Sequence, residues 1–316
     1  MQPKNPIRFP VNILLLACLL ASAACSGPSR GPVLPKDLAR AHKSFTLAAG
    51  HYKKGCFRQA LEGYQAAHEL FSAADDLRGV GLSLEAMANV YQQLEDTESA
   101  LLLYDEALAA FSGPGLEKER IYALTNKAAA LASIDKVDQA GLVLDQAERL
   151  AHGNGGRPVL LQRVRGLLLL RANRLKAAEK VLKKALREAV GSRADQWPAT
   201  AFTLARVLEA SGRRQQALEL YRRALDRDRR QGAYDQMAED LAAMGNLEAA
   251  GNNPCRAVDY LKRAAKIEAL LGRPQKAAGL MERMKACARS CGIDSTAVDF
   301  FVSRWANGET RVNICR

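Results

Sequence analysis

The sequence predicts an all-α fold, a solenoid of about six helix–turn–helix units closed at its C-terminal end by a capping helix. One observation behind this prediction is a period of about 40 residues through most of the chain, because a fixed period of that size is the signature of stacked repeats. The other is helical spacing inside each period, with small or apolar residues at i, i+4 and i+7.

Four columns of residues define the period. One alanine recurs at intervals of 40, 40, 38, 39 and 40 residues: Ala60, Ala100, Ala140, Ala178, Ala217 and Ala257. A second alanine follows each one seven residues later: Ala67, Ala107, Ala147, Ala185, Ala224 and Ala264. Between them stands a large residue: Tyr64, Tyr104, Leu144, Leu182, Tyr221 and Leu261. Twelve positions before the first alanine lies a small residue: Ala48, Ala88, Ala128, Gly166, Ala205 and Gly245. Small residues let paired helices approach, and the large residues fill the space beside them.

These columns resemble the tetratricopeptide repeat over roughly residues 35–271. The resemblance implies a right-handed superhelix whose concave groove is lined by the first helix of each pair. The period here is longer than the usual repeat of about 34 residues. The bulky aromatic usual early in the first helix is missing, and the closing proline is not regular. An armadillo or HEAT-type array has an overlapping period, but the alanine columns favour the tetratricopeptide interpretation.

The helices are expected in pairs, at 37–54 with 57–72, 75–94 with 97–112, 116–133 with 136–152, 157–172 with 175–189, 197–211 with 214–231, and 235–251 with 254–271. Glycine, proline and asparagine mark the breaks between them. One further helix from 274 to about 290 has no partner of the same pattern, so residues 272–316 are expected to cap the open end of the stack. The tail is expected to add a short helix through Trp305. Phe300, Phe301 and Trp305 are expected to pack on the last repeat, with an exposed aromatic contact as the alternative.

The first 24 residues are predicted to be a signal peptide. Lys4 and Arg8 precede the apolar run 11–24, which is too short to span a bilayer. Small residues and then Cys25 follow, which resembles a bacterial lipoprotein signal with Cys25 as the lipidated first residue of the mature chain. The resemblance implies an exported outer-membrane lipoprotein that faces the periplasm.

Two features of this N-terminal region bear on that expectation. Ser22 stands where leucine is usual, so ordinary cleavage that leaves Cys25 as a thiol, in a soluble periplasmic or secreted protein, is the alternative. Residues 25–36 contain three prolines and two glycines without periodicity. We expect them to form a tether between the lipid and the repeats at 37–271.

Export permits disulfides, and five cysteines remain for them: Cys56, Cys255, Cys287, Cys291 and Cys315. The helix that starts near Cys255 should run antiparallel to the capping helix, which places Cys255 near Cys287 and Cys291. We therefore expect one of these two to pair with Cys255 and the other with Cys315, leaving Cys56 free. A metal site is the rival, but no histidine lies near and the CxxxC spacing is unusual for zinc. No metal or other cofactor is predicted.

No catalytic constellation stands out in the sequence. The histidines lack an acidic or cysteine partner at catalytic spacing: His42, His51, His68 and His152. No GxSxG, HExxH or Walker-type motif occurs. The sequence therefore predicts a protein that is not an enzyme.

Charge is distributed unevenly along the chain. Residues 26–156 hold 13 Lys and Arg against 17 Asp and Glu, whereas residues 157–235 hold 19 against 8. This excess in the fourth and fifth repeats indicates either a solvated basic face or an acidic partner. The partner could be a protein, anionic lipid headgroups or a polyanionic glycan. Export disfavours nucleic acid.

The family resemblance also projects a set of groove-facing residues from the repeat register: Glu85, Asn89, Gln92, Arg163, Arg171, Arg206 and Asn246. The lysine and asparagine set that clamps a peptide's C-terminal carboxylate in chaperone-binding members is not reproduced. Two hypotheses follow. The first is an envelope-anchored scaffold that binds a partner protein in its groove, as in secretion, pilus or outer-membrane assembly. The second is a module that binds an anionic glycan, as in exopolysaccharide export, or a lipid headgroup through repeats four and five.

Overall fold

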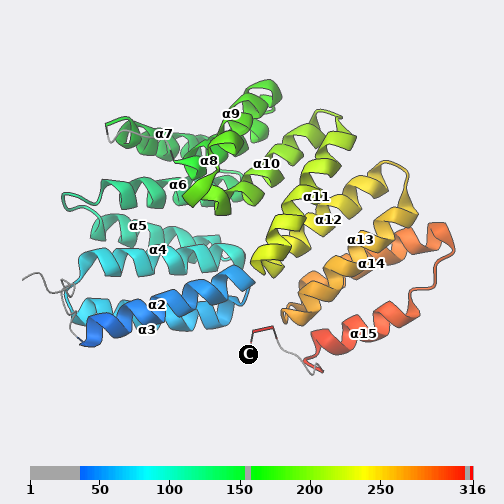
Figure 1. Cartoon of the computed structure of the whole chain (residues 1–316), viewed down its shortest axis with the longest axis horizontal. Helices are drawn as coiled ribbons and strands as arrows, with labels where there is room; N and C mark the ends of the chain where they lie inside the picture. The colour runs from blue at the N-terminus through cyan, green and yellow to red at the C-terminus, as the bar shows by residue number, and fades with distance from the viewer. Residues whose placement is uncertain (1–35, 154–157, 310–313, 316) are drawn as a thin grey trace, which may run out of the picture. The chain divides into compact units, whose positions relative to one another are not determined.

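The computed structural model describes residues 36–153, 158–309 and 314–315. The predicted signal peptide, Cys25 and nearly all of the tether lie outside them. Residues 37–316 form one compact unit, which the following paragraphs describe. Its regular structure is helical throughout the described residues (Figure 1). None of these helices combines the length and the apolar character that crossing a bilayer requires.

Each helix begins and ends within two residues of its expected range. In chain order they are α2 Lys36–Lys54, α3 Phe57–Ala73, α4 Leu77–Gln93, α5 Thr97–Ala110, α6 Glu117–Ser133, α7 Val137–Gly153, α8 Val159–Arg171, α9 Leu175–Glu188, α10 Trp197–Ala210, α11 Arg214–Gln231, α12 Tyr234–Ala250, α13 Pro254–Leu270, α14 Pro274–Cys291 and α15 Thr296–Ala306. A 3₁₀ turn, η1 Gly191–Gln196, was not expected and leads into α10.

The helices form pairs, and we call α2, α4, α6, α8, α10 and α12 the first helices and their partners the second helices. Each first helix packs on its partner, and α4, α6, α8, α10 and α12 also contact one another in succession. Within the described residues no comparable contact joins the second helices α5, α7, α9 and α11. The stack is therefore tighter on the side of the first helices, so that side is its inner, concave face.

One left-handed residue recurs at the turn inside every pair. These residues have φ between 54° and 84°: Gly55, Glu95, Asp135, Asn173, Gly212 and Asn252. The next backbone N–H donates to the carbonyl five residues back, as Cys56 does to His51 at 2.9 Å. This bond is the mark of a Schellman helix end. The left-handed residues keep the spacing of the first alanines, so the same turn is repeated in each unit.

The four sequence columns meet inside each pair. The alanines of both columns are fully buried, and the large residues between them are at most 4% exposed. A Cβ atom added to Gly166 would lie 2.5 Å from Leu182, and one added to Gly245 would lie 2.7 Å from Leu261. The small-residue column therefore exists because the large side chain of the partner helix occupies the space beside it.

The C-terminal helices cover the end of the stack. Helix α14 packs along α13, and α15 packs on both of them. Val302 is buried in that contact, and Trp305 packs against the same core cluster. Phe300 and Phe301 are 54% and 46% exposed, so the expectation that they pack on the last repeat is wrong for both. They lie on the outer side of α15, where their rings contact each other edge to face.

Two disulfides join distant parts of the chain. Cys255 pairs with Cys291, one of its two expected partners, because α13 and α14 run antiparallel. The expectation that Cys56 is left free is wrong, because Cys56 pairs with Cys315 and Cys287 is the free thiol. The physical reason is that the first repeat lies beside the C-terminal end of the stack, which the linear order of repeats did not indicate.

Candidate partner-binding face

Polar side chains from neighbouring first helices form a connected group on the concave face. Glu85 of α4 accepts a hydrogen bond from Asn126 of α6 at 2.8 Å. Burial raises the pKa of Glu85 to about 7, with Glu119 adding to the effect. The Tyr104 hydroxyl donates to Asn89 at 2.6 Å and lies 3.3 Å from Gln92. Three of the projected groove residues therefore lie on α4 beside Tyr104 and Asn126.

Arg163 lies where helices from distant repeats converge. It is on α8, and the groups that act on it electrostatically are Tyr52 of α2 and Glu239 of α12. Desolvation lowers the pKa of this guanidinium, yet within the described residues Arg163 makes neither a hydrogen bond nor an ion pair. Side chains from three helices separated in sequence by whole repeats thus act electrostatically on one another.

The neighbours of Arg163 are themselves perturbed. Burial, followed by the Asp235 carboxylate, raises the pKa of Tyr52 to about 12, although Gln93 hydrogen-bonds this hydroxyl and opposes the shift. Desolvation by the surrounding protein, followed by the Asp235 charge, raises the pKa of Glu239 to about 7. The Glu239 side chain nevertheless remains exposed to solvent. Glu239 is therefore accessible from solvent while it lies within the influence of the Asp235 charge.

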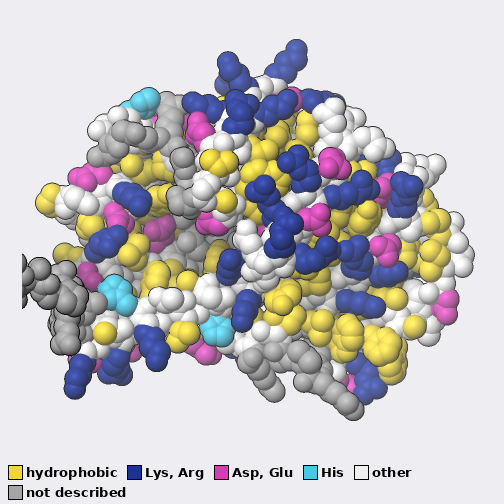
Figure 2. All heavy atoms as spheres, viewed as in Figure 1, with side chains coloured by type: hydrophobic (Ala, Val, Ile, Leu, Met, Phe, Trp, Pro, Cys, Tyr) yellow, Lys and Arg dark blue, Asp and Glu magenta, His cyan; other side chains and the backbone are white. Residues whose placement is uncertain are grey.

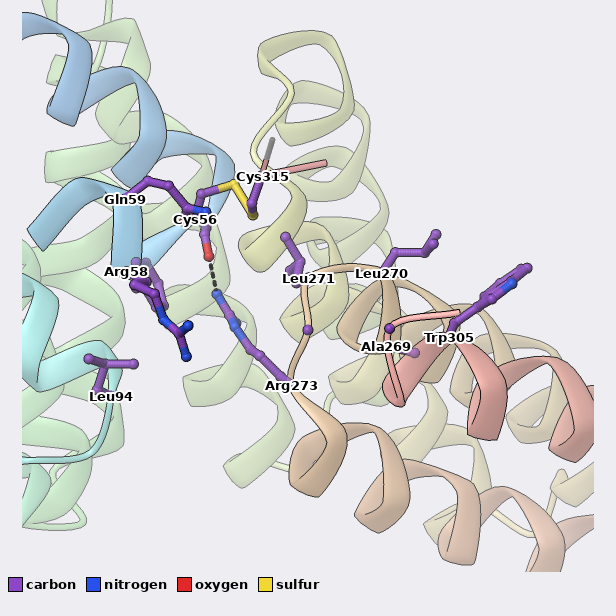
Figure 3. A pocket seen from close by; sticks show the side chains of 14 residues that line it. Cys56, Arg58, Gln59, Leu94, Ala269, Leu270, Leu271, Arg273, Trp305 and Cys315 are labelled. Carbon is purple, nitrogen blue, oxygen red and sulfur yellow. Dashed lines mark hydrogen bonds between the residues drawn. A yellow bond between two sulfur atoms is a disulfide. The ribbon is translucent and has the colours of Figure 1, made fainter. Parts of the chain in front are cut away.

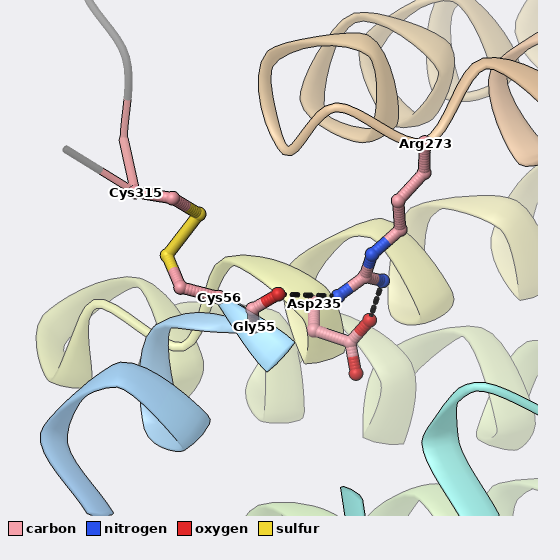
Figure 4. The surroundings of a disulfide bond; sticks show 5 residues. All are labelled: Gly55, Cys56, Asp235, Arg273 and Cys315. Carbon is pink, nitrogen blue, oxygen red and sulfur yellow. Dashed lines mark hydrogen bonds and ion pairs between the residues drawn. A yellow bond between two sulfur atoms is a disulfide. The ribbon is translucent and has the colours of Figure 1, made fainter. Parts of the chain in front are cut away.

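A contact between the first and last repeats closes the array beside this group. Arg273, just before α14, donates to the Gly55 carbonyl at 2.7 Å and pairs with Asp235 (Figure 4). Its guanidinium also lies 3.3 Å from Glu268 and 4.4 Å from the Phe57 ring centre. We call this set of contacts the seam.

The Cys56–Cys315 disulfide lies next to the seam and bridges 259 positions in the sequence. A second ion pair joins Lys276 of α14 to Glu95 in the α4–α5 turn at 3.6 Å. A cavity of about 320 Å³ lies between the two ends of the array, with Arg58 and Leu94 on one wall and Leu271 and Trp305 on the other (Figure 3). The first and last repeats are therefore joined by covalent, ionic and cation–π contacts.

The remaining projected residues lie apart from the Arg163 group. Arg171 is exposed and pairs with Asp135 at 3.2 Å. Asn246 is exposed and accepts a hydrogen bond from Arg283 of α14 at 3.0 Å. Arg206 is half-buried on α10, near enough to Tyr221 to oppose the rise that burial causes in the pKa of that hydroxyl.

The basic surplus of the fourth and fifth repeats lies mainly on the outer side of α9 and α11. Lysine and arginine side chains gather over these helices (Figure 2). Several are exposed without a carboxylate partner among the described residues: Lys176, Lys180, Arg187, Arg223 and Arg230. Much of the surplus is therefore available to an acidic partner.

Sequence reasoning did not find Tyr52, Asn126, Glu239 or the seam residue Arg273. Tyr52 stands in the same repeat column as Gln92, and Asn126 stands in the column next to that of Glu85, so extending the projection to every repeat would have included Tyr52, and a window one residue wider would have included Asn126. Arg273 carries no such signal, because its partner Gly55 is 218 residues away. No cluster of histidine, cysteine or carboxylate side chains suited to a metal occurs in the described part of the chain.

Comparisons with known proteins agree on the fold. Two tetratricopeptide repeat family profiles match, one at residues 37–112 and the other at residues 202–236. No curated protein matches the chain. Among solved structures, a Rap protein complexed with competence and sporulation factor aligns with a TM-score of 0.57 at 17% identity, over 81% of this chain and 77% of that one.

Two further solved structures give the same result. The Rap conjugation gene regulator of plasmid pLS20, in complex with the Phr* peptide, has a TM-score of 0.57 at 14% identity, over 90% of this chain and 86% of that one. The APC/C hetero-tetramer Cut9–Hcn1 has a TM-score of 0.52 at 15% identity, over 87% of this chain and 46% of that one. The columns, the stacked helix pairs and these matches together identify the chain as a tetratricopeptide repeat protein, a fold that suggests a scaffold for protein–protein interaction.

Proposed function

We propose that this protein is an envelope-anchored scaffold whose concave face binds an extended segment of another envelope protein. The observation that carries the proposal is Arg163. Its guanidinium is half-buried and loses hydration, and the Glu239 carboxylate acts on it without a hydrogen bond or ion pair among the described residues. A partly buried guanidinium whose N–H donors are unused is unfavourable. A carboxylate or carbonyl oxygen of a bound segment would supply an acceptor for them.

The surroundings of Arg163 suit a polypeptide ligand. Amide side chains at Asn89, Gln92 and Asn126 offer donors and acceptors along the neighbouring helices. An extended segment presents N–H and C=O groups in alternation, which such amides can bind. Two structures of the same fold are complexes with a factor and with a peptide, respectively, which agrees with this use of the groove.

The anchoring part of the proposal comes from the sequence alone. The basic start, the apolar run and Cys25 suit a lipid-modified N-terminus followed by a tether. Such an anchor would hold the repeats at the periplasmic side of the outer membrane. The class of pathway we propose is assembly of a secretion system, a pilus or outer-membrane proteins.

A crosslinking experiment in the native envelope tests both parts. The full chain is crosslinked, solubilised in detergent and recovered, and its partners are identified by mass spectrometry. We compare it with Cys25→Ala, Arg163→Ala and the matched control Arg149→Ala, which removes an exposed arginine from the outer side of α7. We expect one near-stoichiometric envelope protein with the unmodified chain and with Arg149→Ala.

The variants separate the two claims. Loss of that protein with Arg163→Ala supports the concave site, and loss with Cys25→Ala supports the anchor. Equal recovery from Arg163→Ala and Arg149→Ala would contradict the groove, whereas equal recovery from Cys25→Ala would contradict only the anchor. Recovery of polysaccharide or anionic lipid without a protein would contradict the scaffold as a whole.

The exposed excess of Lys and Arg side chains on α9 and α11 favours a second candidate function. In this alternative, repeats four and five bind an anionic glycan or lipid headgroup. Binding of that kind depends on charge and weakens as salt screens it. Glycan affinity should therefore collapse in high salt and with Lys180, Arg223 and Arg230 changed to Glu. Protein binding in the groove should keep most of its affinity in salt.

A further inference from the structure

A groove of about 430 Å³ opens on the outer side of the array between α9 and α11, with α10 as its floor. We call it the leucine groove after the four leucines that line it: Leu186, Leu204, Leu208 and Leu220. Leu204 and Leu208 are anchored in the core with 2% and 3% of their surface exposed. Leu186 and Leu220 are half-buried and pack on the same core, so part of each still faces the groove.

Basic residues surround these leucines. Lys183 and Arg213 stand on the rim and share one carboxylate, Glu179, at 2.7 Å from each. Arg223 lies on the same rim, 5.1 Å from the Trp197 ring centre, with no carboxylate within ion-pair distance among the described residues. Glu219 is the one acidic side chain among the described lining residues. The groove thus combines an apolar floor with a rim of positive charge.

Two other outer grooves between α5 and α7 also combine leucines with basic residues, but with fewer basic residues each. One of them has a similar volume, about 450 Å³. There the rim lysine Lys127 pairs with the rim carboxylate Asp105. The same groove also has Lys136 on its rim, and the other groove is lined by Arg120 and Arg149. The leucine groove differs in having three basic lining residues where each of these has two.

We propose that the leucine groove binds an acidic amphipathic helix of a partner protein. Leucines spaced at i, i+3, i+4 and i+7 form one apolar stripe on a helix, and such a stripe can insert between α9 and α11. Glutamates beside the stripe would then face Lys183, Arg213 and Arg223. The 19 basic against 8 acidic residues of positions 157–235 give this region the complementary charge.

The leucine floor is what favours a helix over the other anionic partners. A sulfated glycan has charge but no apolar side chains to cover the floor. An anionic membrane is too broad to reach the floor of a groove between two helices. Apolar surface that remains in water contributes nothing to affinity, whereas a partner that covers it gains roughly 25 cal/mol per Å².

Fluorescence anisotropy on the purified full chain tests the proposal. The probe is a labelled helical peptide with leucine every third or fourth residue and glutamate on both flanks. A second peptide has serine in place of each leucine and the same charge. A size-defined heparin fragment and phosphatidylglycerol vesicles represent the glycan and the membrane. The variants are Arg223→Glu and Leu220→Asn, with Lys136→Glu and Leu142→Asn as matched controls on the outer side of α6–α7.

We expect the leucine peptide to bind at least about tenfold more tightly than the serine peptide. Arg223→Glu and Leu220→Asn should each weaken it by about tenfold or more, while Lys136→Glu and Leu142→Asn leave it within about twofold. Leu220→Asn should not change heparin binding. Circular dichroism of each variant establishes that it is folded before its affinity is compared.

Three results would overturn the proposal. Equal affinity for the leucine and serine peptides would mean that charge alone is recognised. Tight binding of heparin or vesicles without binding of the leucine peptide would assign the surface to a glycan or a membrane. Concentration-dependent self-association in light scattering, abolished by Arg223→Glu, would mean that a second copy of this chain occupies the groove.

Discussion

The guanidinium of Arg273 donates a hydrogen bond to the backbone carbonyl of Gly55, across 218 positions of sequence. The same guanidinium neutralises Asp235 and Glu268, whose side chains are 2% and 6% exposed. Removing one partner of a buried ionic group leaves the other charges without compensation. The seam should therefore be one of the most sensitive places in the fold.

Arg273→Ala should lower the free energy of unfolding by about 3–5 kcal/mol. Arg263→Ala is the matched control, because Arg263 pairs with Asp259 at the surface and should cost less than about 1 kcal/mol. Urea denaturation followed by circular dichroism measures both. Similar losses for the two variants would mean that the seam contributes no more than a surface ion pair.

The two disulfides should differ in their effect on stability. Cys56–Cys315 encloses 259 residues and Cys255–Cys291 encloses 36. Loop-closure entropy then predicts that the longer link stabilises the fold by about 1.7 kcal/mol more. Paired Cys→Ser variants of each link, compared by urea denaturation, measure this difference. A larger loss from Cys255→Ser with Cys291→Ser would contradict it.

The pattern of disulfides can also be checked directly. Alkylation of the native protein should label Cys287 alone among the five cysteines of the repeats and tail. Peptide mapping without reductant should then recover Cys56 linked to Cys315 and Cys255 linked to Cys291. A peptide that links Cys287 to Cys315 would show that the first repeat is not joined to the tail.

Asp228 of α11 and Asp240 of α12 should make stability depend on pH. They hydrogen-bond each other in a buried site, and burial together with their mutual repulsion raises the pKa of Asp240 far above its usual range. Stability from a carboxyl with a raised folded pKa is full below its unfolded pKa of about 3.9 and is lost as pH rises toward the folded value. The protein should therefore become less stable from about pH 4 upward.

Asp240→Asn should flatten this dependence, because the amide cannot ionise. The slope per carboxyl is at most about 1.4 kcal/mol per pH unit, so the change between pH 5 and pH 8 should shrink by up to about 4 kcal/mol. Urea denaturation at several pH values provides the measurement. Asp226→Asn, an exposed change on the neighbouring helix α11, should keep the slope of the unmodified protein. Parallel curves for Asp240→Asn and the unmodified protein would refute the assignment.

Two glycine-to-alanine substitutions should change the stability of the fold in opposite directions. Gly245→Ala places a Cβ atom 2.7 Å from Leu261 and should cost about 1–3 kcal/mol through overpacking. A Cβ atom added to Gly279 in α14 meets nothing within 4 Å. Gly279→Ala should therefore stabilise the fold by up to about 1 kcal/mol through helix propensity. Thermal melts of both variants test this, and destabilisation by Gly279→Ala would contradict the open space around that residue.

The repeat columns predicted the architecture because they record local packing. Each first alanine, such as Ala217, is fully buried, and its helix packs on the helices just before and after it in the sequence. A short window of sequence therefore contains the main packing partners. The turn residues could have been found in the same way, since Gly55 and Gly212 both lie five positions before a first alanine. Helix ranges followed directly from this register.

The long-range contacts could not be predicted in this way. Whether Cys56 meets Cys315 depends on how far the superhelix turns over six repeats, and small rotations per repeat accumulate along the stack. The convergence of Tyr52, Arg163 and Glu239 depends on the same accumulated angle. Residue types within one repeat do not encode that angle, which is why Cys56 was expected to be a free thiol.

The Cys56–Cys315 link also changes what a protease can do to this molecule. Between these cysteines the polypeptide and the disulfide form one covalent circle. A single cut in an exposed turn, such as the one at Gly115 between α5 and α6, opens the circle but releases no fragment. Only a second cut or a reductant would separate the pieces, so a nicked molecule can keep both halves of its array in place.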